Sequence, residues 1–286
     1  MAFGVIASVC SLGVVCNAIF EPIIAEQVGV TFALVFGLGI CVCSWICCVF
    51  LVLLDAKADS QIEEEEVAEK AENVNMCKET CSLKLPFWLL MTIVTFVCGV
   101  NITYTVNISL MLETEFLLPK NQSSYFYGLP RLMMLFISPL TGFMISKFGR
   151  RAYFLMGSIT GITLTCIVSL TLVQFNIHNY LFIIPLVLLG IADSFFGGSL
   201  WTSIPCTVPE QSLGIAFGIL DCLRNASITV DTFVTGKVLS TPGLAKNGFP
   251  LYLMIIAVLS GLGLLAAIAL ICDDKINRGG VLTTNT

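Results

Sequence analysis

The sequence predicts an all-α, polytopic membrane protein with about eight transmembrane helices. Charged residues make up 12% of the chain, about half of the share found in soluble domains, and hydrophobic residues make up 57%. The apolar residues form long segments, each about the length that a helix needs to cross a bilayer. Within lipid, only helices and closed barrels satisfy the backbone, so each segment is predicted to be a helix.

Eight apolar segments follow one another along the chain, at residues 1–20, 30–54, 86–112, 125–146, 152–173, 180–204, 212–236 and 250–272. The first segment could instead be a signal peptide. It lacks the basic region that follows Met1 in such peptides, so we treat it as a spanning helix.

The loop Gly142–Arg151 sets the expected orientation. It holds Lys147, Arg150 and Arg151 with no acidic residue, and short basic loops between spanning helices face the cytoplasm. By alternation, most other lysine and arginine residues outside the helices then also lie on the cytoplasmic side. Asn121, in an Asn-Gln-Ser acceptor pattern, falls on the opposite side and is a candidate glycosylation site.

The predicted organisation has four parts. Residues 1–54 hold two helices, and residues 55–85 form an acidic cytoplasmic linker that includes the run Glu63 to Glu66. Such acidic runs usually remain solvated. Residues 86–272 hold six helices, and residues 273–286 form a cytoplasmic tail. The net charge of −5 comes mostly from the linker, so it indicates neither an acidic nor a basic partner, and no nucleic-acid footprint is visible.

Ionisable residues inside predicted helices are the best candidates for function, because each costs roughly 2.5–3.5 kcal/mol to insert in lipid. Three of them share the segment 212–236. At 100° per residue, one face of about 120° holds these three charged residues and several polar ones: Asp221, Arg224, Asn225, Asp231, Thr232 and Thr235, together with Ile228. Either Asp221 and Arg224 neutralise each other at i,i+3, or Arg224 binds a substrate carboxylate while Asp221 or Asp231 meets an amine or a proton.

Other polar residues in the helices allow more than one interpretation. Asp193 and Trp201 could line the same cavity, although Asp193 could equally be a packing residue. Asn101 and Tyr104 are candidate substrate contacts, but an interhelical hydrogen bond explains them as well. Arg131 follows Pro130 near the expected outer end of its helix, so we predict that it snorkels to the interface.

The sequence predicts no enzyme, cofactor or metal site. It lacks a phosphate-binding glycine loop, a zinc-protease pair and a serine elbow. Cys77 and Cys81 have no histidine nearby, which argues against zinc, and juxtamembrane palmitoylation is the better hypothesis. Most of the 13 cysteines lie in apolar segments, where they act as small hydrophobes.

One loop motif resembles a known family. The spacing of its residues is similar to that of the loop joining the second and third helices in each half of major facilitator superfamily transporters: Gly142, Ser146, Lys147, Gly149, Arg150 and Arg151. Ser146 replaces the acid usual in that motif. A complete facilitator has twelve helices, so the chain resembles a partial major facilitator fold without the first four. We expect a fragment, or else a reduced protein that assembles with something else.

Further runs resemble one branch of this superfamily, the lysosomal dipeptide transporters typified by major facilitator superfamily domain-containing protein 1. The runs are Leu12–Asn17, Phe87–Leu90, Ser138–Gly142, Gly190–Ser194, Ser199–Trp201, Val208–Gly218 and Arg278–Gly280. The resemblance implies uniport of dipeptides from lysosome to cytosol, often with a glycosylated single-span accessory subunit. Ser11 stands where the branch has an arginine in the substrate cavity.

We therefore expect a secondary transporter that moves dipeptides or similar zwitterions by alternating access in a lysosomal or other endomembrane. Arg224 would anchor a carboxylate, and Asp221 and Asp231 would serve the amine end or a proton. The cavity would be completed by Asp193, Asn17, Asn101, Tyr104, Trp201 and Asn225. Two alternatives remain: a truncated, non-transporting partner or assembly factor, and a proton-coupled carrier of another small organic solute.

Overall fold

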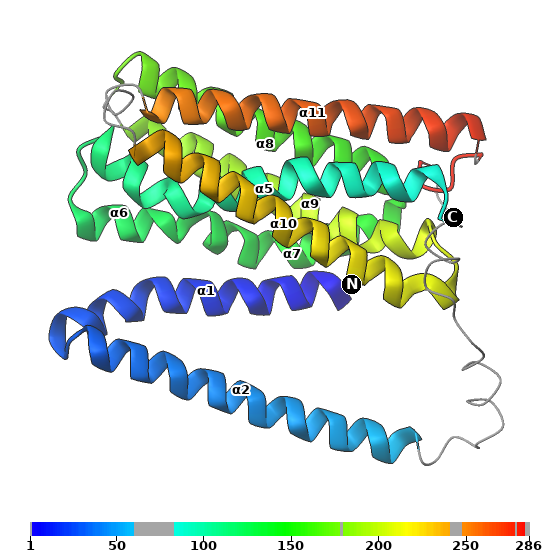
Figure 1. Ribbon diagram of the computed structural model, residues 1–286, viewed down its shortest axis with the longest axis horizontal. Helices are drawn as coiled ribbons and strands as arrows, with labels where there is room; N and C mark the ends of the chain where they lie inside the picture. The colour runs from blue at the N-terminus through cyan, green and yellow to red at the C-terminus, as the bar shows by residue number, and fades with distance from the viewer. Residues whose placement is uncertain (1, 60–82, 178–179, 241–247, 278, 284–286) are drawn as a thin grey trace. The chain divides into compact units, whose positions relative to one another are not determined.

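The computed structural model describes residues 2–59, 83–177, 180–240, 248–277 and 279–283, and the regular elements in these ranges are helices (Figure 1). The α-helices are α1 (Ala2–Gln27), α2 (Val30–Asp59), α5 (Leu85–Thr114), α6 (Lys120–Tyr127), α7 (Leu129–Phe148), α8 (Arg151–Gln174), α9 (Ile183–Ser203), α10 (Leu213–Ser240) and α11 (Gly248–Asn277). Two compact units are present, residues 1–16 with 83–286, and residues 17–82.

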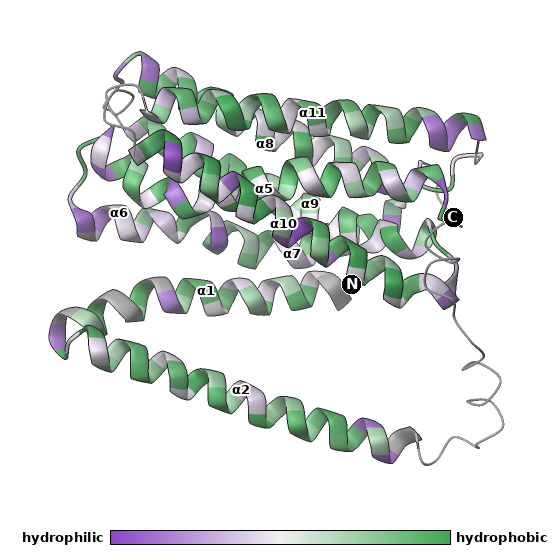
Figure 2. Cartoon of the chain, in the orientation of Figure 1, coloured by the Kyte–Doolittle hydropathy of each residue, from purple (hydrophilic) through white to green (hydrophobic). Residues whose placement is uncertain are grey.

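The predicted polytopic, all-α fold is confirmed. Among the described residues, seven helical segments are long and apolar enough to cross a membrane, and α1 adds a shorter apolar stretch, Gly4–Asn17. Figure 2 shows apolar residues along the whole length of these helices. The predicted acidic linker 55–85 begins later, because α2 continues to Asp59, and residues 60–82 lie outside the described part. The tail also begins later, because α11 continues to Asn277.

The predicted segment 125–146 is longer in the structure and is divided in two. Gly128 ends α6 and also precedes α7, and Pro130 occupies the first turn of α7. Proline is tolerated there because the first backbone N–H groups of a helix have no partner within it. Taken together, α6 and α7 form one candidate span of 27 residues, Gln122–Phe148.

The six-helix half packs as one bundle inside the first unit. Helix α8 contacts α9 and α11, α5 contacts α10 and α11, and α7 contacts α9. A continuous core of side chains fills the space between them, with the largest fully buried members Tyr252, Phe87, Leu90, Met91, Ile93 and Ile108. Apolar side chains on the outer surface, such as Leu265 and Val258, suit contact with lipid.

Helices α5 and α10 meet at Gly99. A Cβ atom at this position would overlap the Asp231 carboxylate and the Ser227 hydroxyl of α10. Ser227 Oγ donates a hydrogen bond to the backbone oxygen of Thr95 on α5. Because a glycine lies at the contact, α10 can bring two polar side chains directly against the backbone of α5.

The chain after α11 folds back onto α8. Asp274 is fully buried, and its carboxylate accepts hydrogen bonds from the backbone N–H of Leu282, at 3.1 and 3.0 Å, and from Thr283 Oγ1 at 2.9 Å. The Leu282 oxygen in turn accepts a hydrogen bond of 3.1 Å from the N–H of Ala152, in the first turn of α8. The tail thus joins the end of α11 to the start of α8.

The second unit, residues 17–82, contains the end of α1 and all of α2. Gly29, between these helices, has a φ of 106°, a conformation that glycine adopts without the cost paid by other residues. Within α2, the 28-residue segment Val30–Lys57 is the candidate membrane span.

Candidate functional site

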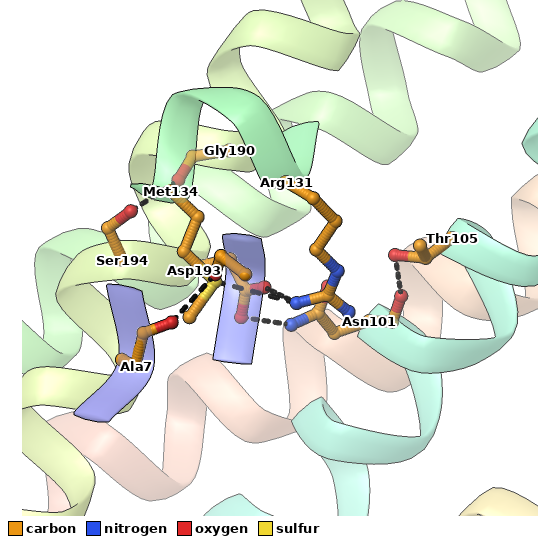
Figure 3. Close-up of polar contacts among 9 residues, drawn as sticks. Ala7, Asn101, Thr105, Arg131, Met134, Gly190, Asp193 and Ser194 are labelled. Atoms are coloured by element: carbon orange, nitrogen blue, oxygen red, sulfur yellow. Dashed lines mark hydrogen bonds and ion pairs between the residues drawn. The ribbon is translucent and has the colours of Figure 1, made fainter. Parts of the chain in front are cut away.

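Three polar side chains from three helices meet inside the six-helix half (Figure 3). Arg131 Nη1 of α7 lies 3.0 Å from Asp193 Oδ2 of α9, which is an ion pair and a hydrogen bond. Asn101 Nδ2 of α5 donates to Asp193 Oδ1 at 2.5 Å. Both oxygens of Asp193 are therefore engaged, and the acid connects helices that are distant in sequence.

The prediction that Arg131 snorkels to the interface is wrong. Helix α6 extends this span outward, so Arg131 is the tenth residue of the span Gln122–Phe148 and lies about 14 Å along the helix from Gln122. Asp193 is the fourteenth residue of the 27-residue span Tyr180–Cys206. The pair is thus near the middle of both spans, the depth at which transporters place their substrate sites.

The cluster is partly accessible and keeps spare hydrogen-bonding groups. The side chains of Arg131 and Asp193 are 22% and 14% exposed. Both contacts recorded for Arg131 within the described residues, to Asp193 and to Met134 Sδ at 3.5 Å, use Nη1, which leaves the N–H groups of Nη2 and Nε for another acceptor. Asn101 Oδ1 is buried and has no hydrogen-bond partner among the described residues.

A second charged pair lies on α10. Arg224 Nε is 3.4 Å from Asp221 Oδ1, and the two side chains are 36% and 53% exposed. This is the geometry of the self-neutralising i,i+3 pair. Asn225 is exposed, and its Nδ2 donates to the backbone oxygen of Asp221 at 2.8 Å.

The predicted polar stripe follows the edge of the packing face of α10. Asp231 and Thr235 lie on the side turned toward the bundle, where Thr235 is buried and Asp231 approaches Gly99. Asp221, Asn225 and Thr232 lie on the exposed side. The stripe is therefore partly buried against the bundle and partly exposed.

The charges of α9 and α10 approach the same part of α5. Asp231 of α10 contacts Gly99 of α5, and Asn101, which binds Asp193 of α9, follows two positions later. Arg224 lies about two helical turns before Asp231 on the same polar stripe of α10. We define the mid-membrane polar cluster as these groups around residues 98–101 of α5: Asn101, Arg131, Asp193, Arg224 and Asp231.

Two other predicted site residues, Tyr104 and Trp201, have packing partners of their own. Tyr104 is buried, and its hydroxyl is 2.6 Å from Ser169 Oγ of α8, so it joins two helices inside the bundle. Trp201 is half-buried and stacks on Phe217 with ring centroids 5.8 Å apart. Asn17 belongs to the second unit. Ser11 is buried, and its hydroxyl donates to Ala7 O of its own helix at 2.8 Å.

The loop motif forms the turn between α7 and α8. Gly149 has a φ of 65° and donates its N–H to Ile145 O at 3.0 Å, which ends α7. Lys147 lies over the rings of Phe143 and Phe148, and Ser146 Oγ donates to Gly142 O at 2.7 Å. Arg151 contacts Cys206, in the connection between α9 and α10.

Several predictions concern residues with little or no description in the structure. Asn121 lies in the first turn of α6. Cys77, Cys81 and the acidic run Glu63 to Glu66 lie outside the described residues. Within the described ranges, no group of three histidine, cysteine or acidic side chains is arranged to hold a metal ion.

Comparison with known proteins identifies the family. Residues 1–230 match the family model of the Major Facilitator Superfamily, whose members are generally carriers rather than enzymes. The chain is 26% identical over 259 residues to the lysosomal dipeptide transporter MFSD1 of Danio rerio, covering 87% of this chain and 51% of the relative. The Mus musculus protein of the same name is 25% identical over 252 residues, covering 87% of this chain and 50% of the relative.

The corresponding protein of Bos taurus is 24% identical over 215 residues, covering 75% of this chain and 44% of the relative. The chain thus spans about half the length of these curated relatives. The match to the family model covers most of the chain, and the seven apolar spans form part of the fold that the family predicts. The chain is a multi-pass membrane protein that belongs to the major facilitator superfamily.

Proposed function

We propose that the protein takes part in the transport of small zwitterionic solutes, dipeptides in particular, by alternating access. The observation that carries the proposal is the mid-membrane polar cluster, in which cations and acids from α7, α9 and α10 gather with Asn101 of α5 near the middle of the spans. Charges at this depth are costly in lipid and mark substrate or ion pathways.

The two ion pairs suit different parts of a zwitterion. Arg224 holds Asp221 at 3.4 Å, and both side chains are substantially exposed, so a substrate carboxylate can replace Asp221 as the partner of Arg224. Charge-assisted hydrogen bonds from arginine to a carboxylate are often bidentate, which favours this exchange. Asp221, once released, and Asp231 are then placed to meet the substrate amine, with Asn225 beside them.

The Arg131–Asp193 pair makes a second contribution. Both carboxylate oxygens of Asp193 are hydrogen-bonded. Arg131, in contrast, keeps N–H groups that can donate to a ligand, and Asn101 Oδ1 is buried with no hydrogen-bond partner in the described residues. These groups can bind the peptide bond of a dipeptide, because they supply both a donor and an acceptor. Trp201, Tyr104 and Asn17 are the further residues that we propose to line the cavity.

Uptake of a radiolabelled dipeptide into proteoliposomes tests the proposal, with the protein expressed from its complete reading frame. Arg224→Ala is expected to reduce uptake at least about tenfold, because a charged hydrogen bond of roughly 1.5–3 kcal/mol to the substrate is lost. Lys237→Ala, in the last turn of the same helix, is the matched control and is expected to retain uptake. Unchanged uptake in Arg224→Ala with normal expression would remove Arg224 from the site.

The named relatives are lysosomal dipeptide transporters, which supports a lysosomal or other endomembrane location and a dipeptide substrate. A glycosylated single-span accessory subunit belongs to the same proposal. A single-span glycoprotein that co-purifies with the tagged protein from lysosomal membranes would support the accessory subunit. Absence of the tagged protein from a plasma-membrane fraction would support the endomembrane location.

A second candidate is proton-coupled transport, and Asp231 favours it. This carboxylate is partly exposed, approaches Gly99 and Ser227, and has no recorded ion pair in the described residues. A carboxylate in such surroundings can exchange a proton during a transport cycle. Uptake driven by an imposed pH gradient, and lost in Asp231→Asn, would identify proton coupling; uptake independent of the gradient would identify uniport.

A further inference from the structure

A cavity of about 900 Å³ lies between the start of α8 and the end of α11, apart from the mid-membrane polar cluster. It is lined by Arg150, Tyr153, Phe154, Lys275, Gly279, Gly280 and Thr283. Both helices are candidate membrane spans that end here, so the cavity lies at the level of the lipid headgroups. The basic loop lies at this end of the bundle, which the positive-inside rule assigns to the cytoplasm.

Two cations line the cavity without an acidic partner. Arg150 is exposed immediately before α8, and Lys275 Nζ lies 5.5 Å from the centroid of the Tyr153 ring. The adjacent acids are already engaged: Asp273 accepts a hydrogen bond of 2.7 Å from Asn277, and buried Asp274 binds the tail. The ion pairs found in the described residues involve neither Arg150 nor Lys275, so both cations can pair with an anionic ligand.

The tail forms a fixed wall of this cavity. Gly279 and Gly280 have φ values of 65° and 88°, which turn the chain back toward α8. The hydrogen bonds that the Asp274 carboxylate accepts from Leu282 N–H and Thr283 Oγ1 then hold the wall in place. A ligand therefore meets a largely preformed site, which reduces the cost of ordering the chain on binding.

A second part of the lining is aromatic. Phe154 stacks on Phe195 of α9 with ring centroids 5.8 Å apart and an interplanar angle of 9°, and Tyr153 stands beside Lys275. Aromatic residues favour the headgroup level of a bilayer, and basic pockets between spanning helices on the cytoplasmic side bind phosphorylated headgroups. A ligand with a phosphate group and an attached apolar part matches both walls.

We propose that this cavity, named here the α8–α11 pocket, binds the phosphorylated headgroup of an anionic lipid, with its phosphate groups paired to Arg150 and Lys275. A soluble phosphate compound shares the phosphate but lacks the acyl chains that would lie against the outer faces of α8 and α11. Binding here also contacts the loop motif and the tail together, so the lipid would stabilise the docked tail.

The test measures binding of four probes to the purified, detergent-solubilised full chain: dioctanoyl phosphatidylinositol 4,5-bisphosphate, dioctanoyl phosphatidylcholine, inositol 1,4,5-trisphosphate and inorganic phosphate. The bisphosphate lipid is expected to bind most tightly. Arg150→Gln and Lys275→Gln are each expected to weaken it about fivefold, and the double variant about 25-fold. Lys147→Gln is the matched control, because Lys147 lies in the last turn of α7, three residues before Arg150, but does not line the pocket, and the affinity of this variant should change less than about twofold.

Each other outcome overturns the proposal. An equal loss in Lys147→Gln would show general surface attraction rather than a pocket. Equal affinity for inositol trisphosphate or inorganic phosphate would reassign the pocket to a soluble phosphate compound, and equal affinity for phosphatidylcholine would remove the role of charge. The test does not depend on transport, so a failure of the proposed function leaves its result unaffected.

Discussion

Two kinds of acidic residue occur in the six-helix half. Asp193 and Asp274 are mostly or fully buried, and both oxygens of each are hydrogen-bonded to groups from other parts of the chain. Asp221 and Asp231 lie along the edge of α10, where one has a single long ion pair and the other packs against a glycine. The first two connect elements of the structure, and the second two remain open to new partners.

This difference separates structural roles from binding roles. A carboxylate whose oxygens are all engaged cannot bind a solute without first losing its present partners, which is costly in a medium of low dielectric constant. An exposed ion pair contributes only about 0–1 kcal/mol of stabilisation, so a charged solute can replace one of its two members. We therefore expect substitutions at Asp193 and Asp274 to affect stability, and substitutions at Asp221 to affect uptake.

The largest effect on stability is expected for Asp193→Ala. The change leaves Arg131 without a counterion in the middle of the membrane and removes the partner of Asn101. The expected destabilisation is on the order of 3 kcal/mol, measured by thermal unfolding in detergent. If Asp193→Ala unfolds at the same temperature as Asp221→Ala, the distinction between the two kinds of acid fails.

A somewhat smaller effect is expected for Asp274→Ala, about 2 kcal/mol, because hydrogen bonds to a charged acceptor are lost in the tail. The loss should be local. Hydrogen exchange at the Leu282 and Thr283 amides should accelerate while exchange in the helices stays slow. The control is Asp273→Ala, whose carboxylate contacts only Asn277 among the recorded hydrogen bonds; fast tail exchange in that control as well would contradict the role of Asp274.

Gly99→Ala should cost about 1–2 kcal/mol, because the added methyl group overlaps the Asp231 carboxylate and the Ser227 hydroxyl and separates α5 from α10. Gly157→Ala in α8 is the matched control, since its Cβ meets no atom within 4 Å. The control should be neutral or slightly stabilising, by up to about 1 kcal/mol. The midpoints of thermal unfolding of the two variants should be compared. Equal midpoints would mean that α10 can move away from α5 without loss of stability.

The smallest effect on stability is expected for Asp221→Asn, below about 0.5 kcal/mol, because the Asp221–Arg224 pair is exposed. Its effect on uptake should be clear, because Arg224 then carries an unpaired charge that binds a carboxylate, while only Asp231 is left to meet the amine. Uptake of a dipeptide and of an N-acetylated dipeptide should be compared, and the preference for the free amine is expected to decrease. A variant that prefers the free amine as strongly as the natural sequence does would show that Asp221 does not contact it.

Much of the fold could be predicted from sequence. The predicted helices agree with α2, α5 and α7–α11 within a few residues, because lipid forces the backbone to hydrogen-bond locally and helix length then follows from the length of the apolar run. The turn after α7 could also be predicted from the basic loop and its glycine, because Gly149 has a positive φ there. The candidate charged residues of α10 were identified, although not their packing against Gly99.

Arg131 is the residue whose depth in the membrane the sequence predicts wrongly. The prediction placed the outer end of its helix too close to Pro130, because the polar residues of α6 resemble a loop. Including α6 in the span, on the ground that proline is tolerated in a first turn, would have placed Arg131 at mid-membrane and made Asp193 its natural partner.

Local sequence is sufficient to establish the all-helical, membrane-spanning character of this protein and the position of its charged residues along each helix. It is not sufficient to establish which charges meet. Asp193 is 62 residues from Arg131 and 92 from Asn101, and Leu282 contacts Ala152 across most of the six-helix half. Such contacts depend on how helices pack side by side, and that packing arises from the complementary shapes of several helices together rather than from the hydrogen bonding of any one of them.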